Sequence, residues 1–306
     1  MSIYTSAQIS KYLEHIGFRH PDNVYQLAAD NPLQLLTQLQ LLHMARVPFE
    51  SLSLHYSQSR LLSLDLEDLF DKIVNKGCGG YCMEVNAFFA TVLRSLGFKL
   101  ISVGGRVARP DGTYKGWDHM TNLVKINNQR YVVDVGFGSN GPTKPIPLEH
   151  GYNFTTIAPA RGKLMYRSLI EHSDPDQRVW VYSVQEHADA LWRDMYCFVE
   201  IEFFPGDFEV MNLKTMTTPQ SFFVQNVMCI KTILNEEKTE PVGWVILHRD
   251  YLKRRVGDKS EIVETFKTED DRIGALEKYF GIVLSEGAKR AIKGLASELR
   301  PKGEHA

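Results

Sequence analysis

The chain has 306 residues, of which 43% are hydrophobic and 24% are charged. This ordinary globular composition excludes a disordered, collagen-like or low-complexity protein, and the length predicts two or three domains. Thirty-five basic residues against 37 acidic ones leave a formal charge of −2, a balance that argues against a general nucleic-acid or membrane-surface binder.

The lack of a recognisable targeting signal and the small number of cysteines both indicate the cytoplasm. No apolar run approaches the roughly 18 residues of a membrane-spanning helix, and the first residues have neither the basic nor the apolar part of a secretory signal. The four cysteines, at positions 78, 82, 197 and 229, are too few for a disulfide framework and fit a reducing cytosol. We therefore expect a cytoplasmic protein.

Residues 5–97 carry the apolar periodicity of amphipathic helices. Four stretches are predicted to be helical: one capped by Ser6 and ended by Gly17, one that begins after Asn31-Pro32, and two over 65–75 and 84–96.

After Gly97 the sequence becomes rich in β-branched and aromatic residues, separated by Gly, Pro and Asn. Strands are predicted over 100–103, 119–126, 130–135 and 179–184, then over 222–233 and 242–247, and a helix over 272–280. The order predicts an α+β protein with helices first, then an antiparallel β-domain, then a mixed α/β segment.

Residues 77–84, GCGGYCME, bring a run of glycines directly to the start of a predicted helix. Cys82 then lies at or near the helix N-terminus, where unpaired amides and the helix dipole favour a thiolate. The thiolate is the attacking form of cysteine, so this placement is typical of a nucleophile. A lone cysteine here could equally be a small buried residue, so the assignment depends on its partners.

A predicted hairpin supplies these partners. The asparagines at 127–128 lie between two predicted strands and favour a two-residue turn. Continued along the strands, this register places His119 and Asp134 on the same face as diagonal neighbours, roughly 7–8 Å apart at Cα. A hydrogen bond between imidazole and carboxylate can span that distance. Together with Cys82, the pair predicts a nucleophile, a base and an orienting carboxylate.

Metal and phosphate chemistry have weaker support. Cys78 and Cys82 have CxxxC spacing, but no second Cys/His pair follows at zinc-site spacing and no HExxH is present, so no metal site is predicted. The glycine-rich run over 136–144 could offer backbone amides and Lys144 to phosphate oxygens. A simple cluster of β-turns explains that run equally well.

At these residues the sequence resembles the arylamine N-acetyltransferase family. The resemblance extends over roughly residues 5–285, and residues 79–84 (GGYCME) and 133–138 (VDVGFG) are its most specific parts. Further matching segments are 12–17 (YLEHIG), 47–50 (VPFE), 93–98 (LRSLGF), 119–120 (HM), 207–209 (DFE) and 280–282 (FGI). The C-terminal tail matches no part of the family pattern.

The resemblance implies a triad scaffold similar to those of cysteine proteases and transglutaminases. A helical domain over 1–97 would carry the nucleophile, a β-barrel domain over 98–210 would carry the histidine and aspartate, and 211–306 would form an α/β lid with a helical tail. The catalytic triad it implies is Cys82, His119 and Asp134.

The activity it implies is transfer of an acetyl or related short acyl group from coenzyme A to an arylamine or arylhydrazine, by a ping-pong route through an acyl-cysteine. Phe49 and Phe137 would line the amine pocket, and Gly104, Gly138 and Ser139 would hold coenzyme A. Acetyl-CoA or another acyl-CoA is thus the expected co-substrate. No permanently bound cofactor and no nucleic-acid or membrane partner is expected.

Two other functions use the same residues. A cysteine hydrolase or transglutaminase-like enzyme has Cys, His and Asp in the same chain order. A papain-type protease fits poorly, because Cys82 and His119 are far closer in sequence than the roughly 130–150 residues of that family. An inactive binding protein on the same scaffold is disfavoured because all three triad positions are filled.

One departure from the family pattern bears on the nucleophile, since the pattern usually has arginine where this chain has Cys78. An arginine there would pair with a carboxylate, for which Glu50 is the candidate, so Glu50 must here be solvated or re-paired. Cys78 is either an inert space-filling thiol or forms a disulfide with Cys82 on oxidation.

The sequence does not determine which acyl group is transferred. An anionic acyl such as malonyl would need a basic pocket, and Arg106 and Arg109 are candidate partners for its carboxylate. Solvated charges on the barrel explain the same two arginines.

Overall fold

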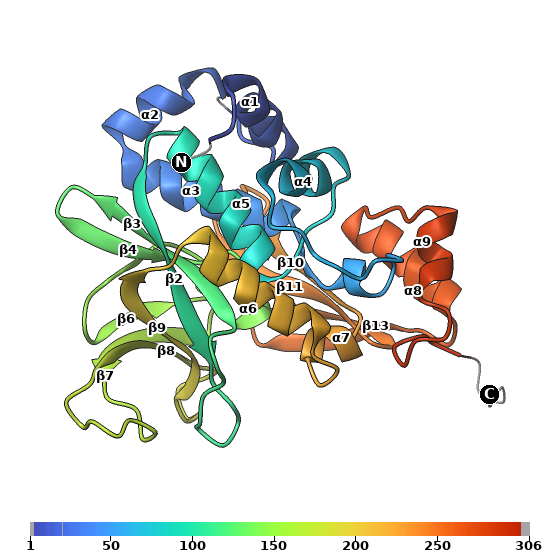
Figure 1. The fold of residues 1–306 in the computed structure, drawn as a ribbon. Helices are drawn as coiled ribbons and strands as arrows, with labels where there is room; N and C mark the ends of the chain where they lie inside the picture. The colour runs from blue at the N-terminus through green and yellow to red at the C-terminus, as the bar shows by residue number, and fades with distance from the viewer. Residues whose placement is uncertain (1–2, 20, 301–306) are drawn as a thin grey trace.

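The computed structural model describes residues 3–19 and 21–300, which form a helical layer and two antiparallel sheets (Figure 1). The helices are α1 (Ser6–His15), α2 (Val24–Asp30), α3 (Pro32–Arg46), α4 (Leu66–Phe70), α5 (Cys82–Ser95), α6 (Pro205–Thr217), α7 (Phe222–Gln225), α8 (Glu269–Ala275) and α9 (Glu286–Ala291). The strands are β1 (Phe49–Glu50), β2 (Lys99–Val107), β3 (His119–Ile126), β4 (Gln129–Val133), β5 (Ile146–Pro147), β6 (Tyr152–Thr155), β7 (Arg161–Arg167), β8 (Val179–Gln185), β9 (Arg193–Glu202), β10 (Met228–Leu234), β11 (Pro241–His248), β12 (Tyr251–Val256) and β13 (Lys259–Thr265).

A capping box sets the start of α1. Thr5 Oγ1 accepts the Gln8 N–H and the Gln8 side chain accepts the Thr5 N–H, so Thr5, not Ser6, caps α1. The predicted helix over 65–75 is α4 followed by one π-helical turn, η3 (Asp71–Asn75).

The apolar faces of α1, α3 and α5 form one core with the covering face of β3 and β4. Tyr12, Leu36 and Phe88 are fully buried there beside Val124 and Val133. Burial of a side chain of this size contributes about 1.5–3 kcal/mol to folding. The packing holds α5 directly against the β3–β4 hairpin.

Eight strands form an antiparallel sheet in the order β5-β4-β3-β2-β9-β8-β7-β6, curled into a nearly closed barrel (Figure 1). β3 and β4 pair in the predicted register, with Ile126 opposite Gln129. Every residue of β3 except Lys125 is buried, because the helical layer covers one face and the barrel interior the other.

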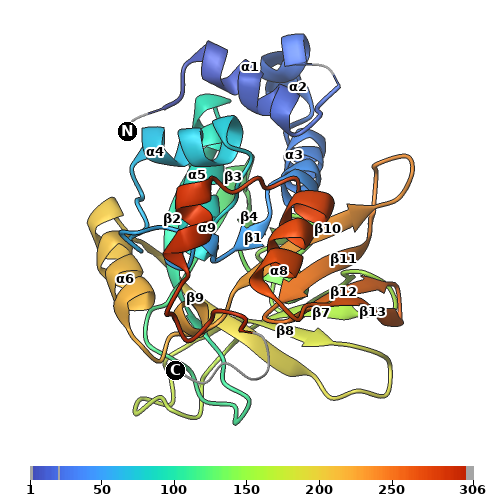
Figure 2. The same cartoon turned by 90° about the vertical axis from the view of Figure 1, so that its right-hand side faces the viewer.

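A second sheet has the order β1-β10-β11-β12-β13. Its edge strand comes from the N-terminal part of the chain, where Phe49 pairs with Ile230 and Glu50 pairs with Cys229. Helices α8 and α9 cover this sheet through an apolar cluster (Figure 2). Residues 1–97 therefore contribute a strand to the C-terminal sheet.

The prediction of one strand over 222–233 is wrong in its first part. Residues Phe222–Gln225 form α7, and β10 begins only at Met228. The ring of Phe223 lies 5.9 Å from that of Phe49 and 5.2 Å from that of Tyr81. This aromatic packing, which joins distant parts of the chain, outweighs the strand propensity of the segment.

The fold is α+β, as the sequence predicts, with a barrel-like antiparallel sheet between helical and α/β parts. The division into 1–97, 98–210 and 211–306 stays a prediction. Within residues 3–19 and 21–300, no helix combines the length and the apolar character needed to cross a membrane.

Candidate active site

Cys82 is the first residue of α5, and only 3% of its surface is exposed. Its Sγ lies 3.6 Å from the backbone oxygen of Asp118, and Cys82 lines the same cavity as His119. The turn before it is tight, since a Cβ on Gly79 would lie 1.7 Å from the Pro48 oxygen. Only glycine fits there, which explains the glycine run that precedes the cysteine.

His119 and Asp134 meet as the hairpin register predicts. His119 Nε2 lies 2.7 Å from Asp134 Oδ2, and both side chains are buried. Burial alone would lower the pKa of His119, but the Asp134 carboxylate and Cys82 outweigh it and raise that pKa to about 10. Burial likewise opposes ionisation of Asp134, yet its partners hold its pKa below the usual range.

Asn86 completes this network and was not predicted from the sequence. It lies one helical turn after Cys82, and its Nδ2 donates to Asp134 Oδ1 (3.0 Å) and to the Met120 oxygen (2.8 Å). Its Oδ1 accepts the Val135 N–H at 3.0 Å. The i, i+4 spacing from the cysteine was the one available signal. Asn86 thus joins the helix of Cys82 to the strand of Asp134.

Gly136 lets the segment after β4 lie close against the start of α5. A Cβ at this position would lie 2.8 Å from the Cys82 Cα and 2.7 Å from Asn86 Nδ2. Its N–H also donates to Asp134 Oδ1 at 2.8 Å. The glycine of the DVGFG run is therefore required by packing against the start of α5.

A cavity of about 730 Å³ opens in front of Cys82 and His119. The two phenylalanines predicted to bind the amine, Phe49 and Phe137, both line it, as does Ser139. The Phe137 ring lies 5.1 Å from the His119 ring. Such a wall suits a flat aromatic acceptor beside the thiol.

Two predicted coenzyme A contacts lie elsewhere. A Cβ on Gly104 would lie 2.3 Å from the Phe203 ring, so that ring occupies the space in front of Gly104. Gly138 lies behind the cavity wall, against Phe49 and Ile230. Among the three predicted residues, Ser139 alone lines the cavity, and the assignment of all three to coenzyme A stays a prediction.

Three cations line the cavity: Arg109, Lys115 and Lys214. Lys115 lies 3.7 Å from the buried Asp118 carboxylate, and Arg109 donates to the Tyr114 oxygen and to Thr113.

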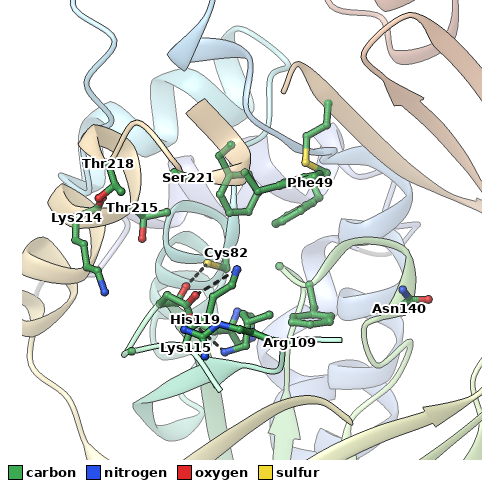
Figure 3. A pocket seen from close by; sticks show the side chains of 18 of the residues that line it. Phe49, Cys82, Arg109, Lys115, His119, Asn140, Lys214, Thr215, Thr218 and Ser221 are labelled. Atoms are coloured by element: carbon green, nitrogen blue, oxygen red, sulfur yellow. Dashed lines mark hydrogen bonds and ion pairs between the residues drawn. The ribbon is translucent and has the colours of Figure 1, made fainter. Parts of the chain in front are cut away.

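Within the described part of the chain, no carboxylate lies within ion-pair distance of Lys214. Figure 3 shows Lys214 and Phe49 on opposite sides of Cys82. No sequence pattern pointed to Lys214, because it sits on α6, far along the chain. Arg106, the other predicted arginine, instead stacks on Trp117, with 4.2 Å between its Cζ and the ring centroid.

Cys78 and Cys82 lie in different apolar clusters on the two sides of the glycine turn. Cys78 Sγ faces the Lys76 oxygen at 3.8 Å, and burial raises the pKa of its thiol to about 11. A thiol of that pKa is a poor nucleophile near neutral pH, which favours the inert interpretation of Cys78. Across residues 3–19 and 21–300, no group of three His, Cys, Asp or Glu side chains is placed to hold a metal ion.

The arrangement around Cys82 has a defined chemical capacity. A thiol that shares its cavity with an imidazole, which a buried carboxylate orients, can attack a carbonyl carbon and hold an acyl group.

The chain is similar to known proteins over nearly its whole length. Residues 32–289 match the family model described as N-acetyltransferase. The chain is 39% identical to N-malonyltransferase FDB2 of Fusarium pseudograminearum (strain CS3096), over 94% of this chain and 92% of that protein. It is 29% identical to arylamine N-acetyltransferase 1 of Homo sapiens, over 90% and 94% of the two chains.

Solved structures share the whole fold. The arylamine N-acetyltransferase of Mycobacterium marinum in complex with CoA aligns with a TM-score of 0.75 at 25% identity, covering 92% of this chain and 97% of that one. The enzyme from Nocardia farcinica aligns with a TM-score of 0.77 at 27% identity, covering 95% of each chain. The family model, the relatives and the fold thus agree, and this chain belongs to the arylamine N-acetyltransferase family.

Proposed function

We propose that this chain is an acyl-CoA-dependent N-acyltransferase that carries the acyl group on Cys82 and delivers it to an arylamine or arylhydrazine. The observation that carries the proposal is the buried His119–Asp134 pair together with Cys82, since Cys82 and His119 both line a cavity with aromatic walls. Family membership supports the reaction class, and the CoA complex of the Mycobacterium marinum relative supports the donor.

The first half-reaction loads the cysteine. Cys82 gives its proton to His119, and the thiolate attacks the thioester carbon of the acyl-CoA. The new bond joins this carbon to Cys82 Sγ, the bond to the CoA sulfur breaks, and the leaving CoA thiolate takes the proton from His119. A His119 pKa of about 10 suits this step, since the imidazole can hold the proton at neutral pH. The backbone N–H of Cys82 is the proposed donor to the oxyanion.

The second half-reaction unloads the cysteine. The amine nitrogen of an arylamine is largely neutral near pH 7 and attacks the acyl carbon directly. The C–N bond forms, the bond to Cys82 Sγ breaks, and His119 moves the amine proton to the departing sulfur. Because both half-reactions use the same sulfur and imidazole, a ping-pong order follows.

We further propose malonyl as the preferred acyl group. The N-malonyltransferase FDB2 relative is more similar to this chain than the human arylamine N-acetyltransferase is. A malonyl group differs from acetyl by a terminal carboxylate. Lys214 lines the same cavity as Cys82, and among residues 3–19 and 21–300 no carboxylate lies within ion-pair distance of its ammonium. A charge-assisted hydrogen bond to that carboxylate would favour malonyl over acetyl.

A donor panel tests the proposal. Purified protein is given malonyl-, acetyl- or propionyl-CoA with aniline, and both free CoA and N-acyl product are measured. We expect amine-dependent product with all active donors and the highest kcat/KM with malonyl-CoA. Release of free acid without amine would instead favour the cysteine hydrolase, and a preference for acetyl-CoA would overturn the malonyl assignment.

The Lys214→Met variant separates the two roles that a cation can play in this cavity. A cation that binds the malonyl carboxylate affects malonyl-CoA alone, and loss of one charged hydrogen bond of about 1.5–3 kcal/mol lowers kcat/KM by roughly ten- to hundredfold. A cation that binds the CoA phosphates affects all donors equally. Lys163→Met is the matched control, because Lys163 stacks on Trp192 of the barrel, outside the cavity.

A further inference from the structure

A buried lysine lies beneath the turn that leads into Cys82. Lys72, in the turn η3, places its Nζ 2.6 Å from Glu84 Oε1 and 3.5 Å from Glu50 Oε1. The lysine side chain is 17% exposed and the two glutamates are 2% and 1% exposed. Three elements that are separate in sequence, η3, α5 and β1, thus meet at one buried ion cluster.

The two carboxylates hold the backbone on both sides of the glycine turn. Glu84 Oε2 accepts the N–H of Tyr81, the residue before Cys82, at 3.1 Å. Glu50 Oε1 accepts the N–H of Gly79 at 3.2 Å, and its Oε2 accepts the N–H of Leu52 at 2.5 Å. The start of α5 is therefore tied through Gly79 and Tyr81 to two carboxylates.

Two buried carboxylates this close together require a cation between them. Burial and the neighbouring Glu50 raise the pKa of Glu84, and Lys72 acts against both. Burial would lower the pKa of Lys72, but Glu50 and Glu84 reverse this and raise it above its ordinary value of 10.5. The ammonium is therefore charged near neutral pH, and its single positive charge lies between the two carboxylates and weakens their mutual repulsion.

Cys78, on the other side of the glycine turn from Cys82, carries no positive charge. Its thiol faces the Lys76 oxygen. We propose that Lys72 is a positioning residue: its charge holds Glu50 and Glu84 together, and these carboxylates hold the turn that orients Cys82. The effect on turnover rests on the proposed role of Cys82, whereas the effect on thiol geometry does not.

The test removes the positive charge at residue 72 and then introduces a positive charge at residue 78. Lys72→Gln keeps a hydrogen-bond donor near Glu84 but no charge, and Lys72→Met removes both. The double variant Lys72→Met/Cys78→Arg places a guanidinium where the family pattern has one. Lys76→Met is the matched control, because Lys76 is 66% exposed and pairs with Asp71 at the surface.

We expect the single variants to lower kcat by about ten- to hundredfold, the size of loss that a displaced reacting group produces. Without the cation, burial and the neighbouring Glu50 raise the pKa of Glu84 unopposed, so kcat of Lys72→Gln falls as pH rises and Glu84 ionises. In wild type Lys72 opposes this shift, so the fall in kcat lies at lower pH. The other titratable groups that face the two carboxylates are the same in both proteins: Cys78, Cys229, His55 and the Tyr81 phenol.

A second measurement keeps the positional claim separate from the proposed reaction. The rate of alkylation of Cys82 by iodoacetamide, followed by peptide mass, reports thiol geometry without any acyl-CoA. We expect it to fall in Lys72→Gln, to recover in the double variant and to stay unchanged in Lys76→Met. If wild type transfers no acyl group but alkylation follows this pattern, the proposed function fails and the positioning role stands.

Two results would overturn the positioning role. One is a Lys72→Gln protein whose alkylation rate and pH profile match those of wild type. The other is a double variant that folds, by its circular dichroism, yet recovers neither the alkylation rate nor kcat. If Lys72→Met alone fails to fold, the comparison between Lys72→Gln and the double variant decides the matter in the same way.

Discussion

Asn86 donates a hydrogen bond from its Nδ2 to Asp134 Oδ1 over 3.0 Å, and so links the helix of the thiol to the carboxylate that orients the imidazole. The same side chain accepts the Val135 N–H. Both contacts are buried, so neither can be replaced by solvent when the side chain is removed.

We expect Asn86→Ala to lower kcat by about ten- to hundredfold, because the position of Asp134 and therefore of His119 relaxes. It should also lower the free energy of unfolding by about 1–3 kcal/mol for each buried group left unpaired. Steady-state kinetics and urea unfolding measure the two effects. Thr91→Val is the control on the same helix, since it removes only a bond to the Ala87 oxygen. A wild-type kcat in Asn86→Ala would show that the network does not need Asn86.

The His119–Asp134 pair predicts a pH-dependent stability. Burial lowers the pKa of His119 but its partners raise it to about 10 against an ordinary 6.5. A group whose pKa is raised by folding stabilises the fold below its unfolded-state pKa, and this contribution disappears as pH rises through the folded-state pKa. The stability advantage of wild type over His119→Gln should therefore be present at pH 6 and shrink between pH 6.5 and 10.

At acid pH, protonation of Asp134 determines how the stability of the fold changes. The pKa of Asp134 lies below its ordinary 3.8, although burial opposes this, so its contribution is lost only as pH falls below 3.8. Urea unfolding of wild type and His119→Gln between pH 3 and 10 measures how stability changes at acid pH and at alkaline pH. A difference in unfolding free energy that stays constant from pH 6.5 to 10 would contradict the assigned ion pair.

Gly136→Ala should damage the site through sterics alone. The added Cβ would meet the Cys82 Cα and Asn86 Nδ2 at under 3 Å, and overpacking of this kind costs about 1–3 kcal/mol. We expect a lower melting temperature together with a loss of kcat. Gly274→Ala is the control, because it lies in α8 with open space around it. It should be neutral or stabilise the protein by about 0.5–1 kcal/mol. Equal behaviour of the two variants would argue against the close contact.

A buried arginine contacts the segment 285–300 through Ser297. Arg272 pairs with Glu269 at 2.5 Å and donates to the backbone oxygens of Ser297 (2.9 Å) and Arg249 (3.1 Å). Arg272→Met leaves a carboxylate without its partner in a mostly buried site, and breaking such a pair costs about 3–5 kcal/mol. We expect faster proteolysis of residues 285–300 and lower stability. Lys278→Met, which removes an exposed pair to Glu264, is the control and should change neither.

Oxidation tests the interpretation of Cys78. Because its thiol packs in a cluster away from Cys82 and has a raised pKa, peroxide should inactivate wild type and Cys78→Ala equally, and dithiothreitol should restore both equally. Reversible loss would then reflect sulfenic acid on Cys82. Restored activity in wild type alone, with a mass loss of two hydrogens in the oxidised protein, would instead establish a Cys78–Cys82 disulfide.

The parts of this protein that its sequence determined by itself are those with local physical causes. The glycine run and the helix periodicity after it predicted a cysteine at a helix start. The two-residue turn at 127–128 set the register of the hairpin, and strand alternation then placed His119 and Asp134 on one face. Each of these follows from contacts between residues near one another in the chain, which leave a periodic signature.

Only the tertiary structure decided what surrounds those residues. Asn86 reaches Asp134 because the apolar face of α5 packs on the hairpin, and Lys214 reaches the cavity because α6 follows the last barrel strand back to it. Of the two alternatives for Glu50, solvated or re-paired, the structure shows the second, and its partner is Lys72, which no motif singled out. Such contacts join elements whose separation in sequence is large and whose approach is set by the packing of whole helices and sheets. No local periodicity records them, because a side chain shows the same pattern along the chain whichever distant partner it meets.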